Sequence, residues 1–275
     1  MTQTMAVFRR EVADRRDLLL LAAAVLVIVL MMPLVPGTGH YSPTEVRGVA
    51  SQVLAMLLGC GVAIGMGLSI FGSDLSAGRL GFFFARPVTA RAIWVGRILA
   101  AIAIALACEF VVAIPAVVEN FGRLIGFSAA SWWAILCAFV LLPILLCLAA
   151  HAFSVMNRSR SAWLLLDLVG LVAVAVGSWL VIRPLYGLGA ALAVCVVGTM
   201  LGLALAGALA MAGFAGLAVG RTDPHRMHGA LSAVLWPLLG TAVIFLAVYG
   251  GWLKGFGPAE MDDVDVFSVS PDGGW

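Results

Sequence analysis

Residues 18–35 read LLLLAAAVLVIVLMMPLV and contain no charged side chain. A helix needs about 20 apolar residues to cross a bilayer core of about 30 Å, so this run has the length of one membrane span. The rest of the chain is similar, because 63% of its 275 residues are hydrophobic and only 11% are charged. Soluble domains carry roughly 25% charged residues, so an ordinary soluble globular protein is excluded.

Long apolar runs recur along the chain and predict seven membrane spans, at residues 18–35, 49–72, 92–118, 131–156, 162–182, 187–220 and 230–252. Each span is expected to be helical, because an open strand would leave backbone groups unsatisfied in hydrocarbon. The sixth run would form roughly 50 Å of helix, so it tilts, extends beyond the bilayer, or breaks at a glycine such as Gly198 or Gly202. We therefore expect an all-α polytopic membrane protein.

The basic residues predict how these spans are oriented. With the N-terminus inside, the inner segments hold 12 of the 16 basic residues and the outer segments hold 4. Basic residues concentrate on the cytoplasmic side of a membrane, so we expect a cytoplasmic N-terminus and an extracytoplasmic C-terminus. A break in the sixth run would change the division to 11 against 5 and return the C-terminus to the inside. The expected location is the cytoplasmic (inner) membrane of a cell.

Residues 1–17, before the first span, carry four arginines: Arg9, Arg10, Arg15 and Arg16. Met5, Phe8 and Val12 recur at helical spacing, whereas the arginines lie on other faces of the same helix. This pattern is typical of an amphipathic helix in the membrane interface, with its arginines at lipid phosphates. Ordinary positive charge beside a first span explains the arginines equally well.

The connector between the second and third spans, residues 73–91, reads SDLSAGRLGFFFARPVTAR. It combines three arginines with a phenylalanine triplet in a chain where charge is scarce. Pro87 ends any helix that precedes it, and Thr89 is suited to cap the next helix. We expect a short helix parallel to the membrane and a sharp turn into the third span. The alternative is a plain loop whose phenylalanines enter the lipid.

Residues 5–100, and above all residues 77–91 followed by Gly96 and Arg97, resemble a permease of the ABC-2 transporter type. In that family the first cytoplasmic loop is a coupling helix that docks on a separate ATP-binding subunit and ends in an Arg-Pro-Val-Ser/Thr-x-Arg turn. The resemblance implies that three phenylalanines are apolar anchors and three arginines form the rim of the docking surface: Phe82, Phe83, Phe84, Arg79, Arg86 and Arg91. Aromatic and arginine side chains commonly dominate interface energies.

The family resemblance also implies a six-span core, so a seventh span would be an addition. No Gly-x-x-x-x-Gly-Lys-Ser/Thr motif occurs, and the single lysine is Lys254. This chain is therefore expected not to be an enzyme by itself, with ATP and Mg²⁺ bound on a partner. Two ATP-binding subunits would join two membrane halves, a homodimer or a heterodimer of permease chains, and export is the expected direction. The net charge of +2 gives no indication of nucleic-acid binding.

Two carboxylates lie within predicted spans and are candidates for the substrate pathway: Glu109 and Asp167. Carboxylates in hydrocarbon usually face a cavity, a partner or a substrate path. For Glu109, a translocation role and a hydrogen-bonded interior carboxylate both stay open. For Asp167 a structural role is favoured, with Arg158, Arg160 or His151 as its partner. His225 and His228 have the i, i+3 spacing of a metal pair, but no further ligand is near in sequence, so a solvated loop is favoured and no metal is expected.

The transmembrane domain is thus expected at residues 18–252, and residues 253–275 form an acidic extracytoplasmic tail. The tail contains a short alternating segment and a Ser-Pro-Asp-Gly turn, similar to the opening strand of a β-propeller blade. It could begin a larger extracytoplasmic portion, pair with a partner, or be a disordered tail.

Two other functions stay open. A secondary transporter or channel would need no ATP-binding subunit, and a membrane-anchor subunit would serve an extracytoplasmic domain. Lipids, drugs and peptides are all compatible substrates.

Overall fold

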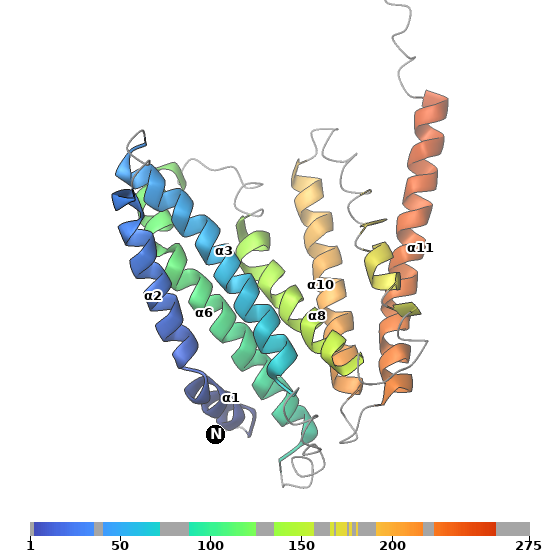
Figure 1. Ribbon diagram of the computed structural model, residues 1–275. Coiled ribbons are helices and arrows are strands. Elements are labelled where there is room, and N and C mark those ends of the chain that lie inside the picture. The colour runs from blue at the N-terminus through green and yellow to red at the C-terminus, as the bar shows by residue number, and fades with distance from the viewer. Residues whose placement is uncertain are drawn as a thin grey trace, which may run out of the picture.

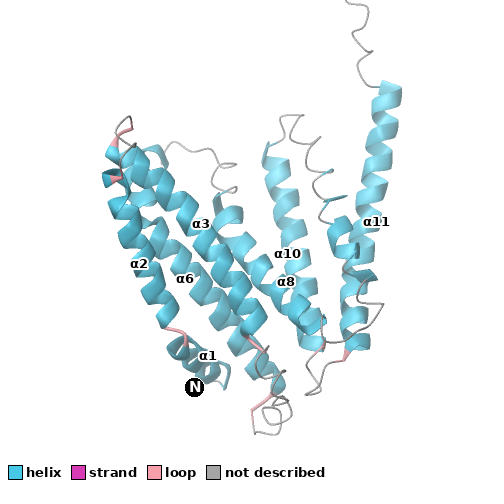
Figure 2. Ribbon diagram, viewed as in Figure 1, coloured by secondary structure: helices cyan, strands magenta, loops and turns pink. Residues whose placement is uncertain are grey.

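The computed structural model describes residues 3–35, 41–71, 88–124, 135–156, 166–167, 169–174, 176–177, 180, 191–216 and 223–256. Regular structure within these ranges is helical throughout, with no strand (Figure 2). The expected all-α class is therefore confirmed for this part of the chain. Residues 72–87, which hold most of the predicted connector, and residues 257–275, which hold most of the predicted tail, lie outside it.

The elements follow one another along the chain as α1 (Gln3–Asp14), α2 (Asp17–Met31), the 3-10 turn η1 (Met32–Leu34), α3 (Pro43–Ser69), α6 (Ala90–Leu124), the π-helical turn η2 (Cys137–Leu141), α8 (Leu142–Met156), α10 (Ala191–Ala215) and α11 (Pro224–Phe256) (Figure 1). Six stretches within them are long and apolar enough to cross a membrane: Asp17–Leu34, Pro43–Ser69, Ala90–Glu119, Cys137–Met156, Val196–Ala215 and His225–Gly251. The predicted run at 162–182 is described only in part.

Several helix boundaries differ from the predicted spans. α3 begins at Pro43, six residues before the predicted start at residue 49, because a capping box precedes the apolar pattern. The Ser42 hydroxyl accepts from the Glu45 N–H at 3.2 Å, and the Ser42 N–H donates to the Glu45 carboxylate at 3.1 Å. α10 is one continuous helix through Gly198 and Gly202, so the break that the glycines could have produced does not occur.

α6 passes through Pro115 without ending, although a proline removes one helical hydrogen bond. Ser51 of α3 lies against this point and is fully buried. Its hydroxyl donates to the Val112 carbonyl at 2.7 Å and accepts from the Ala116 N–H at 3.2 Å. A neighbouring helix therefore supplies polar contacts beside the proline, as is needed where water is absent.

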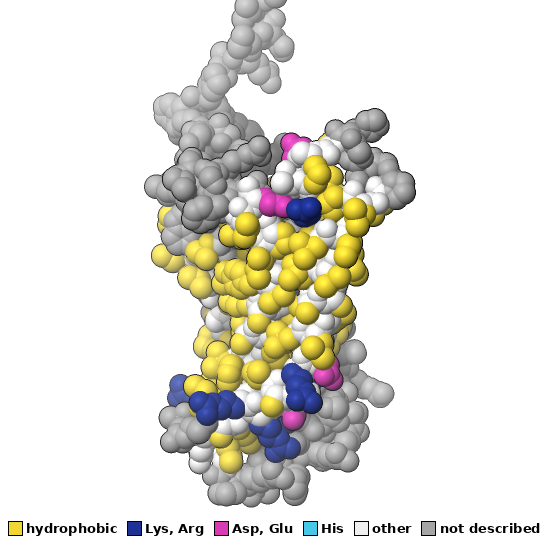
Figure 3. All heavy atoms as spheres, turned by 90° about the vertical axis from the view of Figure 1, so that its left-hand side faces the viewer, with side chains coloured by type: hydrophobic (Ala, Val, Ile, Leu, Met, Phe, Trp, Pro, Cys, Tyr) yellow, Lys and Arg dark blue, Asp and Glu magenta, His cyan; other side chains and the backbone are white. Residues whose placement is uncertain are grey.

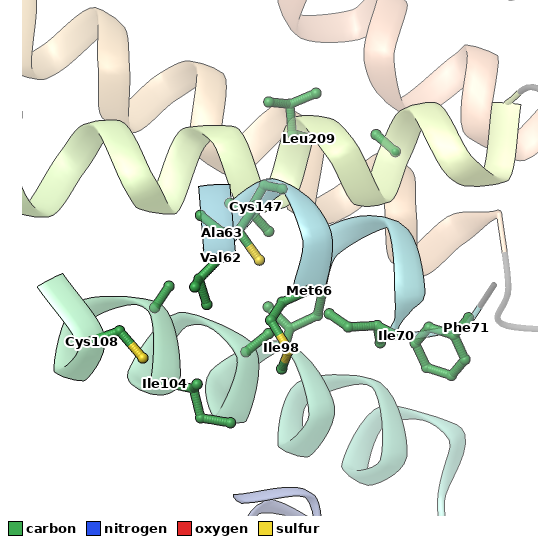
Figure 4. Close-up of a cluster of buried hydrophobic side chains, with 14 of the residues drawn as sticks. Val62, Ala63, Met66, Ile70, Phe71, Ile98, Ile104, Cys108, Cys147 and Leu209 are labelled. Carbon is green, nitrogen blue, oxygen red and sulfur yellow. The ribbon is translucent and has the colours of Figure 1, made fainter. Parts of the chain in front are cut away.

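The apolar core surrounds α3, which lies between α6 and α8. Figure 4 shows Val62 and Met66 of α3 beside Ile98 and Ile104 of α6, with Cys147 of α8 on the other side. These side chains are all nearly or fully buried. The packing of α3 against two helices fixes the position of the residue at which the connector begins.

In the second half of the chain, the helical residues between 166 and 180 run parallel to α11. α8 and α10 both run downward in Figure 1, and the helical residues between 166 and 180 lie beside α11. Ser232 donates to Asp167, and a Cβ at Gly170 would lie 3.9 Å from Leu235 Cδ1, so in both pairs the partner lies 65 residues further along the chain. A Cβ at Gly177 would lie 3.5 Å from Ala242 Cβ, which keeps the same offset. A constant offset means that the two segments run in the same direction.

The lateral surface has the character of a membrane protein. Figure 3 shows a broad apolar band over α2 and its neighbours, with basic side chains along its lower edge, at the end where α1 lies. Large apolar side chains stay exposed within this band, including Leu20, Ile28 and Val53. Exposed apolar area on this scale is compatible with embedding in a bilayer.

Candidate functional site

Four helices meet at the point where the first connector leaves and re-enters the bundle. We call this cluster the connector base and define it as Glu11, Phe71, Trp94, Arg97 and His151. The predicted docking residues Arg79, Phe82, Phe83, Phe84 and Arg86 lie outside the described residues. Arg91 is described and is exposed in the first turn of α6. Thr89 caps that helix, since its hydroxyl accepts from the Ala92 N–H at 3.2 Å, which confirms its predicted role.

Phe71 is the centre of the connector base and is the last described residue before the connector. Its side chain is 1% exposed. Its ring lies 5.6 Å from the His151 ring of α8 and 5.0 Å from the Arg97 guanidinium of α6. The guanidinium over the ring is a cation–π contact. Phe71 therefore joins the end of α3 to both neighbouring helices.

Arg97 holds the two ends of the connector together. Its Nη1 donates to the carbonyl of Ile70 at 2.9 Å, at the end of α3, although Arg97 itself belongs to the start of α6. Its Nε lies 3.7 Å from the Glu11 carboxylate of α1, and the two side chains are only 12% and 14% exposed. Because both side chains are shielded from solvent, removal of either one would leave the other as a poorly solvated, unpaired charge.

α1 packs directly on α6 beside this pair. Gly96 makes the approach possible, because a Cβ there would lie 2.9 Å from both the Thr4 carbonyl oxygen and Val7 Cβ. The Thr89 N–H also donates to the Gln3 side chain at 3.3 Å. The predicted N-terminal helix is therefore present, but the face that contacts the bundle includes Thr4, Val7 and Glu11, whereas Met5 is 45% exposed.

His151 does not serve as the partner of Asp167. The Trp94 indole N–H donates to His151 Nε2 at 3.1 Å, and His151 is 1% exposed. This hydrogen bond satisfies a buried polar pair and links α6 to α8. The prediction that His151 reaches Asp167 is wrong, since the histidine lies in the connector base.

Asp167 is satisfied by α11. Its Oδ2 lies 2.7 Å from His228 Nδ1, and its Oδ1 accepts from the Ser232 hydroxyl at 2.8 Å. The carboxylate is 0% exposed. The predicted partners Arg158 and Arg160 lie outside the described residues. The structural role favoured for Asp167 is supported, because these bonds join the 166–180 residues to α11.

Glu109 is a buried carboxylate of the bundle interior; among the described residues Arg47 and Glu119 also have one buried side-chain atom each without a hydrogen-bond partner. It is 0% exposed, and neither carboxylate oxygen has a hydrogen-bond partner within the described ranges. It faces Gly59 of α3, where a Cβ would lie 2.6 Å from Glu109 Cδ and 2.8 Å from Glu109 Cβ. The space that holds the carboxyl group therefore depends on the missing side chain at Gly59. The hydrogen-bonded alternative finds no partner for Glu109 among the described residues.

His225 and His228 lie in the first turns of α11, not in a loop. His225 is exposed and His228 pairs with Asp167. Across the described ranges no group of three His, Cys, Asp or Glu side chains is placed to hold a metal ion.

Sequence reasoning missed Glu11, Gly59, His228 and Ser232 as functional neighbours. His228 and Ser232 could have been found, because two polar residues four apart share one face of a largely apolar helix. Glu11 carries a weaker signal, its i, i+4 spacing to Arg15, with which it also forms an ion pair at 3.8 Å. Gly59 carries none, since its role exists only when α6 lies against α3.

No family model, curated protein or solved structure matches this chain. Functional conclusions therefore depend on the residues themselves.

Proposed function

We propose that this chain is the membrane-spanning permease subunit of an ATP-driven transporter of the ABC-2 type, an exporter of the cytoplasmic membrane. The connector base is the observation that supports this proposal most. It ties both ends of the connector that resembles a coupling helix to α1, α3, α6 and α8, through Phe71, Arg97 and their partners. A connector can transmit motion to the helices only if its ends are rigidly attached to them.

In the proposed mechanism an ATP-binding subunit docks on residues 73–91 through Phe82, Phe83 and Phe84, with Arg79, Arg86 and Arg91 at the rim. Closure of that subunit displaces the connector. The displacement passes through Phe71 to α3 and α8, and through Arg97 to α6 and α1. Several helices then move together, which is what alternating access requires of a transporter.

The proposed topology has seven membrane crossings, with α1 lying in the interface at the cytoplasmic side. It is supported by α8 and α10, which run in the same direction. The chain must therefore pass back to the other end of the bundle between them. The parallel pairing of the 166–180 residues with α11 is consistent with a crossing in that interval. The N- and C-termini then lie on opposite sides of the membrane.

The proposed assembly contains two permease chains and two ATP-binding subunits, and ATP and Mg²⁺ are bound by the latter. Glu109 is proposed to face the translocation path in another conformational state. A buried carboxylate without a partner is costly, and such groups in membrane proteins commonly have functional roles. Asp167 is not proposed for the path, because its hydrogen bonds already have a structural role.

Glu109 also favours a second candidate function, that of a secondary transporter. An interior carboxylate can bind a proton or a cation directly, without an ATP-binding subunit. The two candidates differ in whether the connector matters.

The test combines purification with mutation of the connector. Tagged full-length chain is purified from its native membrane, and co-purifying proteins are searched by mass spectrometry for a P-loop subunit. Phe83→Ala with Arg86→Ala is compared with Phe110→Ala, which removes an exposed, lipid-facing phenylalanine from α6. We expect the connector variant to lose the P-loop subunit and the ATPase activity of the purified complex, and the control to keep both.

The ABC proposal fails if no P-loop subunit co-purifies with the native chain, or if the connector variant retains it with full ATPase activity. Proton- or cation-driven uptake into vesicles without ATP, abolished by Glu109→Gln, would favour the secondary transporter instead.

A further inference from the structure

An open groove of about 340 Å³ lies between α2 and α3, and one of its lining residues, Arg15, pairs with Glu11 of the connector base at 3.8 Å. Leu21 of α2 and Leu57 of α3 are among its apolar lining residues, and Arg15 and Ser69 are at one end. Its volume lies within the range of small-molecule sites, about 300–1,000 Å³. The two helices separate toward their lower ends in Figure 1, at the side where α1 lies.

The depth of the groove comes from two glycines. Gly61 and Gly65 both line it, and a Cβ built at either position meets no other group within 4 Å. At these two positions the groove wall is helix backbone without a side chain, and the space beside each is open. A larger side chain at either position would begin in open space at its Cβ and extend into the groove.

The length of the groove matches one lipid leaflet. From Ser69 to Leu57 the helix rises by about 18 Å, at 1.5 Å per residue. Half of a bilayer hydrocarbon core is about 15 Å. An acyl chain that begins at the level of Ser69 therefore reaches the middle of the membrane near Leu57.

The α1 end of the groove holds the guanidinium of Arg15, which is fixed in place and whose Nε lies 3.8 Å from the Glu11 carboxylate. Arg15 Nη1 donates to the Ser69 hydroxyl at 2.9 Å and lies 3.4 Å from Met66 Sδ. Arg16 is exposed beside it, and the dark-blue side chains in Figure 3 lie along this edge of the apolar band. A fixed arginine at headgroup level is suited to a phosphate, through charge-assisted hydrogen bonds.

We propose that this groove binds one acyl chain of an anionic phospholipid from the leaflet at the α1 end, with the lipid phosphate at Arg15. The groove combines an apolar lining of suitable length, open space at two glycines and an arginine at one end. An acyl chain fits the first two features, and a lipid phosphate fits the arginine. The proposal does not depend on the transport function.

The experiment uses purified full-length chain reconstituted with phosphatidylglycerol or phosphatidylcholine, including analogues that carry a photoreactive acyl chain. Cross-linked residues are mapped by mass spectrometry, and retained lipids are counted by native mass spectrometry. Gly65→Leu fills the groove. Gly240→Leu is its matched control, since Gly240 also has an open Cβ position but lies on α11. Arg15→Gln is compared with Arg10→Gln, which removes the same charge from α1 at a side chain that is 75% exposed.

We expect acyl-chain cross-links between residues 57 and 69 in the native chain and in Gly240→Leu, and their loss in Gly65→Leu. Arg15→Gln should weaken the preference for phosphatidylglycerol over phosphatidylcholine about fivefold, the effect of one basic residue at a membrane surface, and Arg10→Gln should change it less.

Three results would overturn the proposal. One is cross-linking spread evenly over the apolar surface, and another is an equal effect of the two arginine variants, which would indicate diffuse attraction. The third is that Gly65→Leu changes the oligomeric state and leaves lipid retention unchanged, which would make the groove a contact with a second copy of the chain.

Discussion

At the scale of single residues, Gly59 and Glu109 form an unusual pair. The carboxyl group occupies the space that a side chain at position 59 would fill. Burial of the Glu109 carboxyl group costs free energy, and it also requires that position 59 on the facing helix be glycine.

Gly59→Ala should lower the free energy of unfolding by about 1–3 kcal/mol, because the added methyl group overlaps Glu109 in a packed interface. The matched control is Gly61→Ala, two residues away on the same helix, where a Cβ meets nothing within 4 Å. Thermal or denaturant unfolding of the purified chain measures both.

The double variant Gly59→Ala with Glu109→Ala separates steric overlap from a general loss of helix packing. If the overlap is the cause, the double variant is more stable than the sum of the single effects predicts. Strict additivity would contradict the assigned contact.

The sequence singles out Glu109, since a carboxylate inside an apolar run is visible without any structure. It cannot predict that the carboxylate lacks a partner, because Gly59 lies 50 positions earlier and nothing in its neighbourhood marks it. The same limit applies to His151, whose sequence position near the end of a span suggested Asp167 as a partner. Only the packing of α6 against α8 brings Trp94 to it.

At the scale of elements, α1 and the turn that follows it contact both the end of α3 and the first turns of α6. Its Glu11 meets Arg97, and Arg15 of the turn that follows α1 meets Ser69 at the end of α3. The N-terminal helix is therefore attached to the helices of the connector base, through its own residue Glu11, whatever its relation to the membrane surface.

Arg97→Gln should lower the free energy of unfolding by about 1.5–3 kcal/mol, because the charged hydrogen bond to Ile70 and the pair with Glu11 are both lost. If the chain is the ABC-2 permease proposed above, ATP hydrolysis in the co-purified complex should continue while its coupling to transport is reduced. Unfolding experiments measure the first effect, and a comparison of ATPase with transport rates measures the second.

Arg10→Gln is the control for this prediction, since Arg10 is an exposed arginine of α1 whose pair with Asp14 lies at the surface. Equal loss of stability in the two variants would contradict a special role for Arg97.

Helix existence was largely predictable from the sequence, because uncharged runs of this length have few other structures in a membrane. Helix boundaries were less so. The apolar pattern of α3 begins at Val49, but the capping box at Ser42 sets the true start. α6 continues through Pro115, and the polar contacts beside the proline come from Ser51 of another helix, which the local sequence could not predict.

At the scale of the whole molecule, the constant offset between the 166–180 residues and α11 determines the path of the chain. Two segments that run in the same direction need a crossing between them, which α10 provides. The number of crossings therefore depends on this pairing.

A disulfide between Gly177→Cys and Ala242→Cys tests the pairing, in a chain whose native cysteines are replaced. A Cβ at residue 177 would lie 3.5 Å from Ala242 Cβ, which is within the range of disulfides. Mild oxidation should cross-link this pair and should not cross-link Gly177→Cys with Val243→Cys, since Val243 is exposed on another face. Mobility on a gel after proteolysis between the two sites measures the bond. Cross-linking of the Val243 pair alone would contradict the parallel register.

The parallel register also has a consequence for biosynthesis. Asp167 leaves the ribosome 61 residues before His228 and 65 before Ser232. At about 5–20 residues per second, its carboxylate enters the membrane roughly 3–13 s before its partners have been made. If this segment crosses the membrane as proposed, the nascent chain carries a polar group without its partners during that interval. In the proposed topology we therefore expect this segment to stay out of contact with lipid until α11 has been made.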